Sequence, residues 1–339
     1  MERVQVFNYC AHAIEDLKEL SKATKFTAPR SSRAIQTVIS MLRNSIKFLL
    51  PNCCELIDPE DFRQAHLDMA RLPYPCVAFE APWEKENVCL RMGEFAEALS
   101  TRRIALCWES DPANEVFPGS NDWLEYYPDG GVFVLPVYYS DDHRQWMVGA
   151  GGLFIPHSNF IRKATFEPKL PGSLIAKETR VQNGEAKASA NEYLAEPFEV
   201  LPEMVEQLAY AFGSRDKATA NIILNASDEV TMMIQACSVL NCANVTTVDM
   251  RAEPVINRKR IARGKQPFFS YKVLQLSAEP QTHAVATVAG EKGTHASPRM
   301  HLRRGHLRRL ESKSIWVRHT MVNAGSKLGA VVKDYRINR

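Results

Sequence analysis

The sequence contains no run of eighteen apolar residues, so no membrane-spanning helix is predicted. Its first twenty residues, MERVQVFNYCAHAIEDLKEL, place acids within an amphipathic pattern and lack the apolar stretch of a signal peptide. None of the eight cysteines belongs to a C-x-x-C pair, and most lie in apolar runs, which is typical of reduced thiols in a core. These absences favour a cytoplasmic protein.

Complete motifs for phosphate loops and zinc sites are also missing. The glycines of residues 149–152 lack the strand-to-helix context and the Lys-Ser/Thr ending of a phosphate loop, and they favour strand bulges. His295, His301 and His306 match no zinc spacing, and no cysteine lies near them. We therefore expect no metal and no cofactor.

The spacing of the apolar residues predicts an α+β fold. With 339 residues, 45% hydrophobic and 24% charged, the chain can form a large core. Apolar residues recur at helical spacing over residues 4–22 and again from Ile35 to Leu49, where the helix is expected to stop before Pro51. Short β-rich runs follow, at residues 76–79, 104–107, 132–139 and 146–155.

The charges divide the chain into two parts. Residues 251–339 hold 19 Lys and Arg against five acids, a net charge of +14, which leaves 23 basic and 34 acidic residues, net −11, for residues 1–250. We predict an acidic α+β domain over 1–250, helical at its N-terminus and β-rich in its middle, and a small basic β-rich module over 251–339. The asymmetry points to a polyanionic partner, or to mutual neutralisation of the two parts across an internal interface.

The basic module centres on residues 299–318, RMHLRRGHLRRLESKSIWVR, in which seven of twenty residues are Lys or Arg. Arginine binds phosphate oxygens in a bidentate manner, and interspersed aromatic side chains can stack on bases. The candidate nucleic-acid-binding residues are Arg258, Lys259, Arg260, Arg303, Arg304, Arg308, Arg309, Trp316 and Arg318.

Two histidines open a catalytic alternative. A bend at Gly305 could bring His301 and His306 together beside the arginines. One imidazole could then act as a base and the other as an acid in metal-independent RNA cleavage. Three hypotheses remain open: nucleic-acid binding, with RNA ahead of DNA; a ribonuclease using His301 and His306; and an inhibitor that binds a host protein.

The segments NRKRIARGKQPFFSYKVLQL, SPRMHLRRGHLRRL, IWVRHTMV and VVKDYRI together resemble a family of tailed-bacteriophage proteins with an H-x-R-R-G-H segment followed by a W-V strand. The resemblance extends over Asn257–Ile337 and returns around Ile57–Trp83. It brings no assigned activity and no catalytic residues. It implies a phage origin, action in the host bacterial cytoplasm, and a role in host takeover or counter-defence.

Overall fold

The computed structural model describes residues 6–57, 62–85, 91–92, 94–96, 99–162, 170–184, 192–242 and 245–276. For residues 91–92, 96, 276, 301–303, 306–309, 314–317 and 320–322 it describes the backbone alone. No helix in these ranges is long and apolar enough to cross a membrane.

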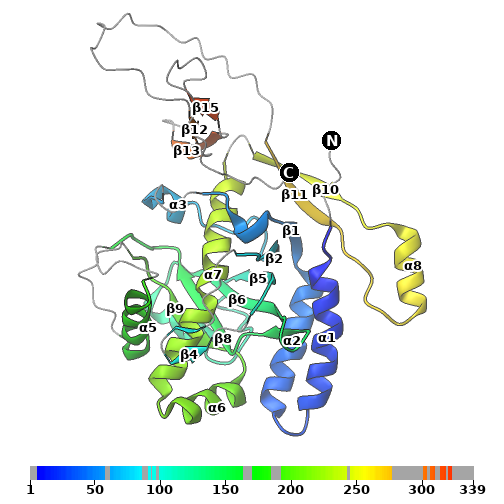
Figure 1. The fold of residues 1–339 in the computed structure, drawn as a ribbon, viewed down its shortest axis with the longest axis vertical. Helices are drawn as coiled ribbons and strands as arrows, with labels where there is room; N and C mark the ends of the chain where they lie inside the picture. The colour runs from blue at the N-terminus through cyan, green and yellow to red at the C-terminus, as the bar shows by residue number, and fades with distance from the viewer. Residues whose placement is uncertain are drawn as a thin grey trace, which may run out of the picture.

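A mixed nine-stranded sheet forms the centre of the molecule (Figure 1). Most neighbouring strands are antiparallel, but β1 pairs in parallel with both β2 and β11. In spatial order the strands are β10 (Val245–Met250), β11 (Tyr271–Leu276), β1 (Ile46–Leu49), β2 (Cys76–Pro82), β5 (Arg102–Glu109), β6 (Gly131–Ser140), β8 (Gly151–Pro156) and β9 (Glu196–Glu199), with β7 (Gln145–Val148) also paired to β6.

Helices cover both faces of this sheet. The two N-terminal helices lie side by side, and the long helix α7 crosses the sheet (Figure 1). The helices are α1 (Tyr9–Thr24), α2 (Pro29–Asn44), α3 (Gln64–Asp68), α4 (Trp123–Tyr126), α5 (Pro171–Gln182), α6 (Pro202–Phe212), α7 (Arg215–Leu240) and α8 (Pro254–Ala262). The expected α+β class, with a helical N-terminal part and a β-rich middle, is confirmed.

Alternation along the strands assigns side chains to the two faces. In β2, Val77 and Phe79 join the cluster that contains the apolar residues of α7, whereas Ala78 joins the cluster of α1 and α2. In β5, Cys107 and Leu106 divide in the same way. Successive side chains of a strand point to opposite faces, so one sheet supports two separate apolar layers.

One sequence prediction about this region is wrong. The helix expected from Ile35 to Leu49 ends at Asn44, and Ile46–Leu49 forms β1. Phe48 is 1% exposed and Leu49 is 5% exposed. Both residues are apolar because β1 is buried between two parallel strands. The prediction was wrong because a short apolar run of this kind also fits the spacing of a helix.

The C-terminal basic segment contributes four short strands, described by their backbone. β12 (His301–Arg303) pairs with β15 (Thr320–Val322), and β13 (His306–Arg309) pairs with β14 (Ser314–Val317), both antiparallel.

A further small antiparallel ribbon is formed by β3 (Arg91–Met92) and β4 (Phe95–Ala96), in which Met92 pairs with Phe95.

Candidate interaction surface

A buried carboxyl group connects helix α1 to β11, the strand that follows helix α8 in the chain. Glu80 of β2 is fully buried and accepts hydrogen bonds from the backbone N–H groups of Tyr9 (3.0 Å) and Cys10 (2.7 Å) and from the hydroxyl of Tyr271 (2.8 Å). Burial raises the pKa of Glu80, although a hydrogen bond from the Cys10 thiol and the three bonds above lower it in part. Glu80 therefore joins the first turn of α1 to the first residue of β11.

Helix α8 lies between β10 and β11 in the chain and stands apart from the other helices (Figure 1). Pro254 occupies its first turn, where the missing N–H is not needed. Gly264 adopts a positive φ of 68° just after the helix, a backbone conformation that glycine adopts readily. The local sequence thus specifies both ends of a short helix.

Polar side chains hold α8 in place. Asn257 and Phe268 exchange two hydrogen bonds, through the Asn257 side chain and the Phe268 backbone, at 2.9 and 2.7 Å. The guanidinium of Arg260 donates to the carbonyl of Gln266 (2.7 Å) and to a carboxylate oxygen of Glu15 on α1 (2.7 Å), and it lies 4.0 Å from the ring centroid of Phe268. Asn257 and Arg260 are three residues apart, so they share one face of the helix.

Apolar residues of α8 are exposed. With 3.6 residues per turn, Val255 lies opposite Asn257 and Arg260, whereas Ile256 and Ile261 lie on either side of them. Val255 is 52% exposed, Ile256 is 40% exposed and Ile261 is 60% exposed, and none of the helix residues is buried. An ordinary surface helix buries its apolar residues, whereas those of α8 remain exposed together with its cations.

Cations lie among these apolar residues. Arg258, Lys259, Arg263 and Lys265 are all exposed, and none of the four has a salt-bridge partner within the described part of the chain. We call the exposed set the α8 surface. It comprises Val255, Ile256, Arg258, Lys259, Ile261, Arg263 and Lys265.

The predicted binding residues divide between this surface and the C-terminal strands. Arg258 and Lys259 are exposed, whereas Arg260 is engaged with Glu15 and Phe268. The backbones of Arg303, Arg308, Arg309 and Trp316 lie in β12, β13 and β14, while Arg304 and Arg318 lie outside the described residues.

The catalytic hypothesis also concerns the C-terminal strands. His301 lies opposite Val322 in one strand pair, and His306 lies opposite Val317 in the other. Their side chains and Gly305 are outside the described residues, so the proposed convergence of the two imidazoles stays a prediction.

Sequence reasoning did not find the histidine–carboxylate pair that the structure forms elsewhere. Nε2 of His157, after β8, lies 2.9 Å from a carboxylate oxygen of Glu109 at the end of β5. The other oxygen of Glu109 accepts from the backbone N–H of Leu72, and the carbonyl of His157 accepts from Arg71. These contacts attach the segment after α3 to the sheet. Among the described residues, no group of three or more His, Cys, Asp or Glu side chains could hold a metal ion.

Comparison with known protein families gives a match that covers most of the chain. Residues 51–324, which include α8, match the model described as AcrVA2-like, the anti-CRISPR type V subtype A2 family. The chain belongs to the AcrVA2-like anti-CRISPR family. No curated protein and no solved structure matches it. Membership agrees with the resemblance to phage proteins and with counter-defence, while the H-x-R-R-G-H motif as a family signature stays a prediction.

Proposed function

We propose that this AcrVA2-like protein inhibits a type V CRISPR–Cas system of the bacterial host by binding a protein component of that system through the α8 surface. The observation that supports a protein partner is the exposure of Val255, Ile256 and Ile261 on a helix held by its polar face. Phosphate groups would gain nothing from these side chains, whereas a protein partner could bury them.

The neighbouring cations indicate the chemistry of that partner. Arg258 and Lys259 flank the exposed apolar side chains and carry unpaired positive charge among the described residues. Such charges accelerate association with a partner of opposite sign and disfavour basic partners. The expected partner surface is therefore apolar at its centre and acidic around it.

Affinity capture tests this proposal. The tagged full-length protein is isolated from host cells that carry a type V locus, with and without ribonuclease treatment. We expect a protein encoded by the type V locus to be retained after ribonuclease, and to be lost with the double variant Ile256→Ser/Ile261→Ser. Phe26→Ser removes a side chain that is 89% exposed on the turn between α1 and α2, and it serves as the matched control. Equal capture by both variants would contradict the role of α8.

A second candidate, RNA binding, rests on a different observation. Residues 251–339 carry a net charge of +14, and four cations of the α8 surface are unpaired in the described structure. Binding of single-stranded RNA should then weaken steeply with salt, with a log–log slope of roughly 0.7 for each phosphate contact. Arg258→Gln/Lys259→Gln should reduce this slope, whereas Ile256→Ser/Ile261→Ser should leave it unchanged. Fluorescence anisotropy at several salt concentrations measures the salt dependence of each variant. Absence of RNA binding at low salt would exclude this second function.

A further inference from the structure

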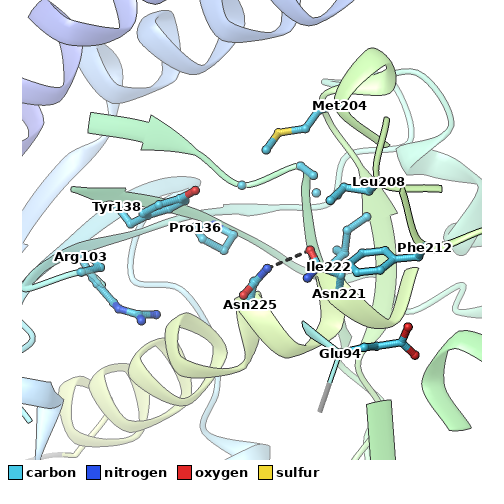
Figure 2. A pocket seen from close by; sticks show the side chains of 14 residues that line it. Glu94, Arg103, Pro136, Tyr138, Met204, Leu208, Phe212, Asn221, Ile222 and Asn225 are labelled. Carbon is cyan, nitrogen blue, oxygen red and sulfur yellow. Dashed lines mark hydrogen bonds between the residues drawn. The ribbon is translucent and has the colours of Figure 1, made fainter. Parts of the chain in front are cut away.

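A pocket of about 280 Å³ opens between α6, α7 and the sheet, away from α8. Met204, Leu208 and Phe212 of α6 form an apolar wall, since they lie four residues apart on one face of the helix. Pro136 and Tyr138 of β6 lie on the other side of the cavity (Figure 2).

Two amides lie between these walls. Nδ2 of Asn225 donates to Oδ1 of Asn221 at 3.0 Å, one helical turn away on α7 (Figure 2). Within the described part of the chain this is the only side-chain hydrogen bond that either amide makes. The pair therefore retains an acceptor, Oδ1 of Asn225, and a donor, Nδ2 of Asn221. Asn221 is only 7% exposed, so its unused hydrogen-bonding capacity is costly without a ligand or water in the pocket.

The charges at the rim disfavour an anionic ligand. Arg103 reaches the pocket, but its guanidinium lies 3.2 Å from a carboxyl oxygen of the buried Glu229 and 3.3 Å from one of the half-buried Asp228. Glu94 also lines the pocket, and its carboxylate is paired with Lys217 at 2.9 Å. With its arginine matched by acids, the pocket suits an uncharged ligand better than a phosphate.

We propose that this pocket binds an uncharged nucleobase, with adenine as the best match. Apolar and aromatic walls, such as those formed by Leu208, Phe212 and Tyr138, suit a planar ring. Adenine presents a donor beside an acceptor, the counterparts of the free Oδ1 of Asn225 and the free Nδ2 of Asn221. The base could belong to a free nucleoside or to single-stranded RNA. The pocket is separate from the α8 surface, so this inference goes beyond the proposed function and does not depend on it.

Calorimetry on the full-length protein with adenosine, AMP, uridine and a short oligoadenylate tests the proposal. We expect adenosine to bind with a Kd below ~1 mM, more tightly than uridine, and AMP to bind no more tightly than adenosine. Tighter binding of the oligoadenylate than of adenosine would identify RNA as the source of the base, and equal binding would identify a free nucleoside. The proposal is overturned if neither adenosine nor the oligoadenylate binds.

Two variants locate the site independently. Asn225→Leu removes the amide at similar volume, and Leu208→Trp fills the cavity while leaving the amides in place. Each should weaken adenosine binding at least about tenfold. Asn183→Leu, which removes an amide at the end of α5, is the control and should bind as the parent does. Every variant is measured below its own Tm, and unchanged affinity in both pocket variants would exclude this site.

Discussion

Arg260 and Glu15 connect α8 to α1 across 245 residues of sequence, at an N–O distance of 2.7 Å. The same carboxylate oxygen accepts the backbone N–H of Gln266 at 3.0 Å. The Arg260 side chain is 13% exposed and that of Glu15 is 26% exposed, so water screens this pair less than it would an exposed one. The orientation of the α8 surface therefore depends on an acid in the first helix.

Replacing Glu15 should loosen α8 with little effect on the core. In Glu15→Gln the charge-assisted bond to Arg260 is lost, and we expect a decrease of about 1–2 kcal/mol in stability together with faster amide exchange over residues 254–266. Glu19→Gln is the matched control on the same helix. Its pair with Lys22 is more than 70% exposed at both side chains and should change stability by less than about 0.5 kcal/mol. Equal exchange in the two variants would contradict this anchor.

Tyr271→Phe tests the connection between β11 and Glu80. The hydroxyl of Tyr271 donates to Glu80 in a site where both residues are almost fully buried. Its removal leaves the carboxyl group with donors from α1, the backbone N–H groups of Tyr9 and Cys10 and the Cys10 thiol, so we expect a loss of about 1–3 kcal/mol in chemical denaturation. Tyr210→Phe, at a side chain that is 91% exposed, should have no measurable effect. A neutral Tyr271→Phe would show that this hydrogen bond contributes little.

Glu229 should make stability depend on pH. Burial raises the pKa of this fully buried carboxyl group to about 7, although Arg103 lowers it in part. Between the ordinary value of 4.5 and about 7, the folded protein therefore holds a proton at Glu229 that the unfolded chain releases. This contribution is fully present at low pH and is lost as pH rises through that window.

The measurement compares the parent protein with Glu229→Gln, whose side chain does not titrate. The unfolding free energy of the parent relative to the variant should fall by about 3 kcal/mol between pH 4.5 and pH 7.5. A relative stability that rises with pH would mean that attraction to Arg103 outweighs burial.

Local patterns in the sequence predicted much of the fold. The helix at Tyr9–Thr24 and the strands at Cys76–Pro82 and Gly131–Ser140 were expected, because their apolar spacing matches a single secondary structure. Residues 169–195 are polar and poor in large apolar side chains, a pattern typical of a loop, but Pro171–Gln182 is helical. Only small side chains of this helix, such as Ala176, are buried, so its apolar pattern is weak.

The candidate sites depend on contacts that a local pattern does not contain. The sequence placed Arg258, Lys259 and Arg260 in one basic cluster, and the structure separates Arg260 from the other two through its contact with Glu15. Likewise, α8 is held by distant polar partners, and its apolar residues remain exposed. Asn221 and Asn225 stand four residues apart in α7, a signal that sequence could have offered, but the cavity beside them requires α6 and β6.

The domain boundary at residue 250 stays a prediction. β10 ends at Met250, and β11, from the predicted basic module, pairs in parallel with β1. Expression of residues 1–250 alone would test it. An independent domain should give a cooperative unfolding transition, whereas dependence on β11 should leave the fragment aggregated or unfolded.

The central claim is that the protein counters type V immunity through the apolar side chains of α8. The most direct test is the plaquing efficiency of a phage targeted by a type V system, on hosts that express the parent, Ile256→Ser/Ile261→Ser or Phe26→Ser at equal levels. We expect the parent and Phe26→Ser to restore plaques and the α8 variant to lose at least about tenfold, as removal of two interface side chains implies. Full restoration by the α8 variant would contradict the account.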